Sequence, residues 1–255
     1  MTMRLIAIAL TAWPLLAQTG FEAVSIRPAD PAARGRSIHG GPGSSDPGLL
    51  TMRNVDLFSL VALAWGLHRY QVSSPDWLNS TYFDISARVP QGIDADQYRR
   101  LLQNMLTERF DLTVHHESRE MRIYDLTVAK NGIKMKQSTN PSMAADGLQP
   151  PPKTPPTGFH GAVTLNLPAM STPRFAEFLS GFLDAPVEDA TGLHGDYEIH
   201  LRALIGAPSP DSDAENAPQT LSDALPRQLG LRLVPRKDQV DILVVDRMNK
   251  SPTGN

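Results

Sequence analysis

Residues 49–64 read LLTMRNVDLFSLVALA, and this stretch shows the pattern on which the fold is built. Leu49 to Met52 are typical of a short strand. The apolar side chains that follow recur at the spacing of an amphipathic helix: Leu57, Leu60, Val61 and Ala64. Asp56 is placed to cap that helix, because its carboxylate can accept from the free N–H groups of the first turn. The stretch therefore predicts a strand that leads directly into a helix.

The same order returns in the second half of the chain. Residues 163–167, VTLNL, are typical of a strand. The apolar side chains after them again have helical spacing: Phe175, Phe178, Leu179 and Phe182. Ser171 or Thr172 would cap this second helix, and Pro173 suits its first turn. The two stretches thus predict a repeated structural unit.

The elements that follow extend the match. Each half continues with a strand (82–85 or 196–199), then a helix (95–108 or 221–229), then two closing strands (111–114 with 124–128, or 231–234 with 242–245). We expect hairpin-like links between the closing strands, and a kink or late start at Pro226, which cannot donate a helical hydrogen bond. This strand-helix-strand-helix-strand-strand order predicts an α+β fold with helices on one face of a mixed or antiparallel sheet.

An internal duplication would explain why the two halves share this order. It predicts three pairs of equivalent, buried residues: Leu60 with Phe175, Phe83 with Tyr197, and Leu126 with Leu243. The alternative is a chance likeness between two amphipathic segments.

Composition divides the chain into five segments. They are a signal peptide (1–17), a first unit with an N-terminal strand and loop (18–137), a Pro-rich linker (138–158), a second unit (159–250) and a tail (251–255). The N-terminal strand is FEAVSIR, residues 21–27, and residues 29–47 are rich in Gly, Pro, Ser and Arg, as loops are. The acidic, Pro-rich residues 206–218 are predicted to form a surface excursion.

The first 17 residues have the order of a secretory signal peptide. Arg4 precedes the apolar run Leu5 to Leu16, and the small residue Ala17 follows it. A retained membrane anchor is the alternative, but about 20 apolar residues are needed to span a bilayer and Pro14 interrupts this shorter run. We expect cleavage after Ala17, no membrane span in the mature chain, and a periplasmic or secreted protein without cysteine.

Charge and motifs exclude several functions. The net charge of -3 and the pI near 6.2 give no basic field for nucleic acid. The phosphate-loop, dinucleotide-binding, zinc-protease and nucleophile-elbow motifs are missing from the sequence, so we expect no cofactor. A non-enzymatic binding or sensing module is the leading hypothesis. The alternative is an envelope or secreted hydrolase with an unrecognised active site, which would bring a His or acid from one half to a Ser or acid of the other.

One titratable cluster could supply metal ligands. His115 and Glu117 would share a face of an extended strand, whereas His116 would point to the other face. Two converging ligands are too few for a metal without help from elsewhere. A solvated strand end that carries ion pairs is the alternative interpretation, and on the residues alone no metal site is expected.

A contact patch is predicted in the connector after the first helix. Tyr70, Asp76 and Trp77 combine aromatic area with polar tips, which suits a glycan, a peptide or a partner protein. Arg34 and Arg36 in the preceding loop would form a mobile, anion-binding rim. The alternatives are boundary packing for the tryptophan and a plain surface loop for the arginines. The equivalent connector of the second half is rich in Gly and lacks Trp, and its glycines suit tight turns.

Several strings resemble one family. They are FEAVSIRP (21–28), YQV (70–72) with PDWL (75–78), FDI (83–85), residues 106–110 and TGLHGDY (191–197). Together they resemble the soil-associated protein family, a paralogous group of uncharacterised exported proteins of soil acidobacteria. Relatives of this domain are also attached to membrane metallopeptidases of the antibiotic-sensor type, which implies an extracytoplasmic sensing or binding role. The resemblance implies no catalytic residues. The repeat unit is also similar in architecture to small α+β modules of secretins and outer-membrane receptors.

Overall fold

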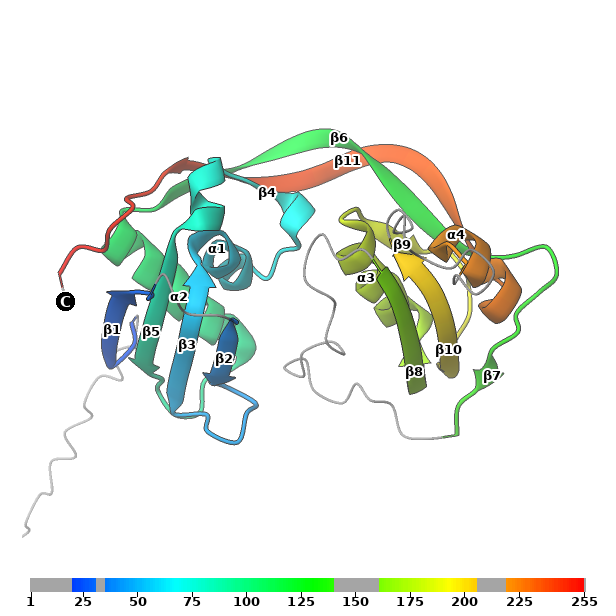
Figure 1. The fold of residues 1–255 in the computed structure, drawn as a ribbon, viewed down its shortest axis with the longest axis horizontal. Helices are drawn as coiled ribbons and strands as arrows, with labels where there is room; N and C mark the ends of the chain where they lie inside the picture. Colours follow the sequence, from blue (N-terminus) through cyan, green and yellow to red (C-terminus); the bar gives the residue numbers. More distant parts are fainter. Residues whose placement is uncertain (1–19, 31–34, 140–160, 206–218, 255) are drawn as a thin grey trace, which may run out of the picture.

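The computed structural model describes residues 20–30, 35–139, 161–205 and 219–254. The predicted signal peptide, Arg34, most of the Pro-rich linker and the predicted excursion 206–218 lie outside the described residues. The described chain forms two lobes, and one long pair of strands runs across both (Figure 1). It is an α+β fold, as the sequence predicts. Among the described residues, no helix is long and apolar enough to cross a membrane.

The first lobe is a four-stranded antiparallel sheet with helices packed on one face. The sheet has the order β1 (Ala23–Pro28), β5 (Tyr82–Arg88), β3 (Leu49–Asp56) and β2 (Ser37–Gly40). Its helices are α1 (Leu57–Trp65) and α2 (Ala95–Phe110). Strand β2 lies inside the stretch that we expected to be loop, because a four-residue edge strand leaves little pattern in a Gly-rich sequence.

The connector between α1 and β5 contains three short elements. They are the 3₁₀ turn η1 (Arg69–Gln71), the strand β4 (Val72–Ser73) and the 3₁₀ turn η2 (Asp76–Ser80).

Local chemistry sets the ends of the helices. The predicted cap Asp56 accepts the backbone N–H of Ser59 at 2.8 Å, and α1 ends at Gly66, which has a φ of 65°. The second-half helix α3 (Thr172–Leu183) begins after Ser171, with Pro173 in its first turn, as predicted. Both features follow from the free N–H groups of a first helical turn.

The second lobe has a smaller sheet in the order β7 (Lys136–Gln137), β10 (Asp196–Ile205) and β8 (Gly161–Ser171). It also contains α3, the strand β9 (Val187–Asp189), and α4 (Leu221–Ala224) followed by the π-helical turn η3 (Leu225–Leu229). The irregular turn holds Pro226, where the sequence predicts a break.

Two long strands join the lobes. β6 (Thr113–Val128) and β11 (Leu231–Arg247) pair antiparallel along almost their whole length, and we call this pair the ribbon. Our prediction of a hairpin closing each half was wrong: 111–114 and 124–128 lie near the two ends of one strand, and 231–234 and 242–245 lie in another. The residues between carry charges on both faces of an exposed two-stranded stretch, so no alternation marks them as strand.

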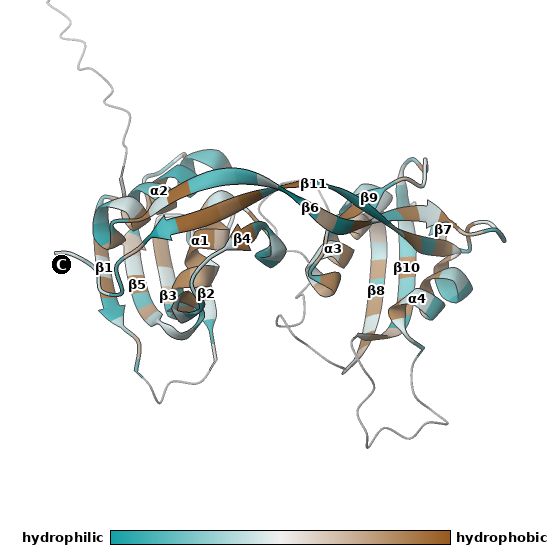
Figure 2. Cartoon of the chain, turned by 90° about the horizontal axis from the view of Figure 1, so that it is seen from above, coloured by the Kyte–Doolittle hydropathy of each residue, from teal (hydrophilic) through white to brown (hydrophobic). Residues whose placement is uncertain are grey.

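The ribbon enters both cores. At one end Leu243 and Val245 of β11 are buried in the first lobe, and at the other end Leu126 and Leu231 are buried in the second lobe. Figure 2 shows the apolar part of β11 above the first lobe. The last strand of the sequence therefore completes the core of the N-terminal lobe.

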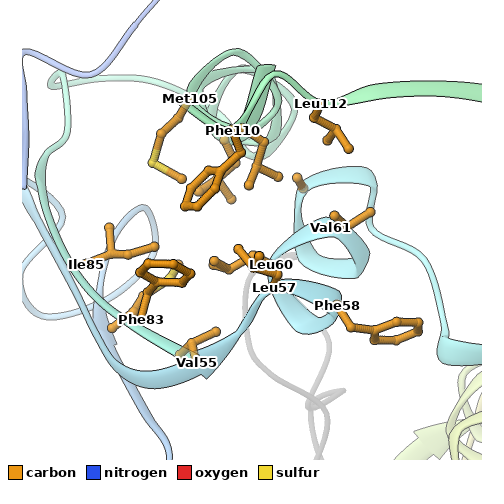
Figure 3. Close-up of a cluster of buried hydrophobic side chains, with 14 of the residues drawn as sticks. Val55, Leu57, Phe58, Leu60, Val61, Phe83, Ile85, Met105, Phe110 and Leu112 are labelled. Carbon is orange, nitrogen blue, oxygen red and sulfur yellow. The ribbon is translucent and has the colours of Figure 1, made fainter. Parts of the chain in front are cut away.

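The first core is packed between the sheet and its helices. Figure 3 shows Phe110, Leu60 and Phe83 turned toward one another, and the rings of Phe83 and Phe110 meet edge to face with centroids 5.2 Å apart. Phe58 points away from this group although its side chain is also buried.

The predicted repeat can be compared position by position. All six residues of the predicted pairs are buried. Leu60 and Phe175 each lie four residues after a helix cap, and Phe83 and Tyr197 each pair with the residue before that cap.

The third pair is out of register. A left-handed residue precedes each long strand: Asp111 comes before β6, and Gly230 comes before β11. Leu126 lies 15 residues after Asp111. The residue 15 positions after Gly230 is Val245, not Leu243. The duplication itself stays a prediction.

Candidate functional site

The two lobes meet where η1 faces α3, and we call this contact the junction. On the first-lobe side, the rings of His68 and Tyr70 are stacked, with centroids 5.3 Å apart. On the second-lobe side, Ser180 of α3 lies close enough to Tyr70 to act on the pKa of its hydroxyl group. Glu177 of α3 and Asp184, the residue that follows α3, lie close enough to act electrostatically on both rings. The junction thus brings together a His, a Tyr, a Ser and two acids.

Burial dominates the protonation of the two rings. It lowers the pKa of His68 below its ordinary value, and the nearby charges of Glu177 and Asp184 oppose that shift. Burial also raises the pKa of Tyr70, whereas the nearby hydroxyl of Ser180 opposes that increase. Both effects favour the neutral forms, because a partly buried charge loses its hydration.

Ser180 has a structural role in the second lobe. Its side chain is buried, and its Oγ donates to the carbonyl of Ala176 at 3.1 Å and accepts the N–H of Val187 at 2.8 Å. These bonds tie the end of α3 to the start of β9. In this arrangement the hydroxyl proton points to the carbonyl oxygen of Ala176.

Sequence reasoning found Tyr70 but missed the other members of the junction. No sequence motif links the residues that were missed: His68, Glu177, Ser180 and Asp184. His68 lies more than 100 residues before the other three. In the structure, Asp184 ends α3 in the left-handed conformation, with a φ of 49° that the sequence does not reveal.

The residues of the predicted patch do not share one set of neighbours in the structure. Tyr70 faces α3, whereas Trp77 packs against the first core with the Nζ of Lys250 5.3 Å from its ring centroid. Asp76 is exposed at the start of η2. Arg36 donates to the Oγ of Ser59 at 2.7 Å and lies 3.9 Å from Asp56, so it is held at the N-terminus of α1.

Replacing Trp77 with Ala tests whether this side chain is mainly packing. Because Trp77 is half-buried against the core, we expect a loss of about 2 kcal/mol in the free energy of unfolding. Denaturant titration measures it, and Asp76→Ala is the control, since the Asp76 side chain is exposed. A Trp77→Ala protein as stable as the control would show that the ring serves contact alone.

The predicted metal ligands form an ion-pair network on the ribbon. His115 Nε2 lies 3.7 Å from Glu117 Oε2, so the two share a face as predicted. His115 Nδ1 is 2.8 Å from Asp246, and Glu117 is also paired with Arg119. No group of three or more His, Cys, Asp or Glu that could hold a metal occurs among the described residues.

The histidine network should be visible in a titration. The hydrogen bond with Asp246 raises the pKa of His115 above its ordinary value. The contribution of this pair to stability is therefore present at acidic pH and is lost as the pH rises through the raised pKa. We expect Asp246→Asn to lower the His115 pKa, measured by NMR, and Asp241→Asn, which removes the partner of His116, to leave it unchanged. An equal effect of both variants would contradict the pairing.

The string TGLHGDY is explained by a structural loop. Asp189 accepts the hydroxyl of the buried Thr172 at 2.7 Å and the N–H of Thr191 at 3.0 Å. Gly192 and Gly195 have φ values of 67° and 88°, which glycine adopts most readily. The loop joins β9 to β10 and holds the start of α3. This agrees with the structural role that the sequence analysis assigns to the two glycines.

Comparison with known proteins places the chain in a family. Residues 58–248 match a family model described as protein of unknown function (DUF3738). The chain belongs to this family. The matched DUF3738 range begins in α1 and includes the second lobe and the ribbon, while β1, β2 and β3 precede it. No curated protein and no solved structure matches the chain.

Proposed function

We propose that this DUF3738 protein is an exported, non-enzymatic binding or sensing module of the bacterial envelope. Its ligand is an extracytoplasmic protein, peptide or glycan, which it meets on the connector beside the junction. The observation that carries the proposal is the hydrogen bonding of the Ser180 hydroxyl group at the junction. This hydroxyl is committed to Ala176 and Val187 in the second lobe. The junction therefore suits contact between lobes better than chemistry.

The connector offers the groups that a partner would touch. Asp76 is exposed, and Trp77 is half-buried beneath Lys250. Arg69 stacks over Phe58 with its guanidinium carbon 4.3 Å from the ring centroid, and donates to Asn79 at 2.9 Å. These bonds hold η1 and η2 together, so a partner would meet a preorganised surface.

The hydrolase alternative draws on one observation. His68 from the first lobe does lie near Ser180 and two acids of the second lobe, which is the convergence expected of an active site across the halves. A fluorophosphonate probe decides between the two functions, because it reacts covalently with an activated serine.

We expect no covalent adduct by intact-protein mass spectrometry. Ser180→Ala should lower the free energy of unfolding by about 1–3 kcal/mol, since it leaves the buried N–H of Val187 without its partner. The matched control is Ser86→Ala on the exposed side of β5. An adduct on the wild type and the control that disappears in Ser180→Ala would establish the hydrolase.

Export and the resemblance support the envelope location. Arg4, the apolar run 5–16 and Ala17 have the order of a cleaved signal. The resemblance to exported acidobacterial proteins and to domains attached to antibiotic-sensor-type metallopeptidases points the same way. Mass spectrometry of the native protein should find Gln18 at the N-terminus, and an intact N-terminus in the cytoplasmic fraction would refute export.

A further inference from the structure

The sheet of the first lobe has one face without helices. Its central strand β5 alternates: Phe83, Ile85 and Ala87 are buried toward the helices. The side chains between them point to the other face: Tyr82, Asp84, Ser86 and Arg88. We call this the open face; α2 lies behind the sheet in Figure 1, and the open face is turned toward the viewer.

Strand register shows which side chains share the open face with β5. Ser25 of β1 and Thr51 of β3 both pair with Ser86, and His39 of β2 pairs with Thr51. Paired residues point to the same face of a sheet. A row of hydroxyl and imidazole groups therefore crosses the middle of the open face.

Arginines lie on either side of this row. Arg27 pairs with Asp84, Arg53 pairs with Ser37, and Arg88 lies at the end of β5. All three arginines are exposed, and within the part of the chain that the structure describes none of them forms an ion pair. The carboxylate of Asp84 accepts the N–H of Asn54 at 2.8 Å. The three arginines thus outnumber the one carboxylate that lies among them, Asp84, in a chain whose net charge is -3. Two further carboxylates, Glu22 and Asp46, lie beyond Arg88.

The open face leads into a pocket at its Arg88 end. This pocket, of about 550 Å³, lies where β1 and β3 begin and β5 ends. Its lining combines planar polar groups with one exposed apolar side chain: Glu22, Asp46, Arg88, Gln91 and Leu49. Carboxylates, a guanidinium and an amide can each form paired hydrogen bonds with neighbouring hydroxyls of a sugar ring.

An exposed aromatic ring lies at the other end of β5. Tyr82 is 43% exposed, on the same face as Arg88. The six residue steps from Tyr82 to Arg88 correspond to about 20 Å of strand. Aromatic rings offer flat apolar area with a polar tip, which suits the apolar face of a sugar. This length fits an oligosaccharide rather than a single sugar.

We propose that the open face binds an acidic oligosaccharide. The arginines pair with its carboxylates, Tyr82 packs against one of its rings, and the pocket at Arg88 holds the hydroxyls of one end. The site goes beyond the junction described above, since it uses different residues. On the sheet of the second lobe the corresponding polar groups are paired with each other: His200 is bonded to Asn166 at 3.0 Å, and Glu198 lies opposite Lys136.

Isothermal titration with polygalacturonate, a polymer of carboxylated sugars, tests the proposal on the mature chain. We expect saturable binding that weakens with salt, because exposed charge pairs are screened. Neutral dextran should not bind. The triple variant Arg27→Gln/Arg53→Gln/Arg88→Gln should lose about tenfold in affinity or more. Tyr82→Ala should lose about fivefold.

The control removes the same charge elsewhere. Arg100→Gln/Arg122→Gln/Lys130→Gln changes three exposed cations outside the open face and should bind as the wild type does. The proposal is overturned if polygalacturonate does not bind, or if the control weakens binding as much as the triple variant. Polyglutamate bound as tightly as polygalacturonate would overturn it too, because the open face would then recognise negative charge alone and not a carboxylated sugar. If the triple variant fails to fold, Tyr82→Ala still tests the proposal. An affinity of Tyr82→Ala equal to that of the wild type would also overturn the proposal.

Discussion

Removing residues 241–255 is expected to unfold the N-terminal lobe. Leu243, Val245 and Met248 are buried in the core of that lobe. Exposing them costs about 1.5–3 kcal/mol each. The same segment satisfies the end of α2, because the N–H of Asn249 donates to Phe110 and that of Thr253 donates to Arg109, both at 2.7 Å. The summed loss is comparable with the whole stability of a typical domain, about 5–15 kcal/mol.

Thermal unfolding and amide hydrogen exchange measure this effect. We expect the truncated chain to lose its cooperative transition and the protection of the amides in α2. Truncation after Lys250 is the control, since it keeps the three apolar side chains and removes the Thr253 contacts. A truncated protein with protected α2 amides would show that the first lobe does not need the C-terminal strand.

Replacing Gly230 with Ala is expected to destabilise the protein by about 3 kcal/mol or more. Gly230 has a φ of 71° at the point where η3 turns into β11. A left-handed backbone costs an L-residue about 1–2 kcal/mol. The added methyl group would also overlap the carbonyl oxygen of Gly132 and approach the Cα of Ile133 to 2.9 Å. Overlap with backbone adds a further strain of about 1–3 kcal/mol.

Gly192→Ala separates these two causes. Gly192 has a nearly equal φ of 67°, but no atom lies within 4 Å of the position of its added Cβ. It should therefore show the backbone cost alone, about 1–2 kcal/mol. Denaturant titration of both variants gives the difference. Equal losses would mean that the segment 132–133 moves aside freely.

Regular elements with one buried face could be predicted from the sequence. α1 and α3 have apolar side chains at helical spacing and a polar residue or proline at their start, and both begin where expected. Strand β5 has the alternation Phe83, Ile85, Ala87, and the expected strand 82–85 lies within it. In each case burial on one face imposes a period that a single sequence displays.

The ribbon could not be predicted, because its middle has no buried face. Glu117 to Arg122 and the residues opposite them are mostly polar, so they give no apolar period that would join the two ends of β6. Pairing partners more than 100 residues apart, such as Val128 and Leu231, leave no local signal either. The sequence therefore predicts parts of β6 and β11 as strands, but it pairs each part within its own half of the chain, whereas β6 pairs with β11.

The candidate sites depend on such distant pairings as well. Tyr70 was found by its chemistry, whereas its neighbours Glu177 and Ser180 come from the other lobe. The open face requires the register of four strands, and its arginines at 27, 53 and 88 look like scattered surface charges in the sequence.

The pairing of β6 with β11 also governs the order in which the protein can mature. A ribosome releases residues 113–128 long before residues 231–247, so β6 waits for its partner during most of translation. Contacts between such distant segments close slowly, because a long loop must be ordered first. The nascent N-terminal lobe therefore stays incomplete, with its apolar interior open on one side, until the C-terminal strand arrives. A chain of this design can complete its first lobe only after residues 231–247 have been synthesised.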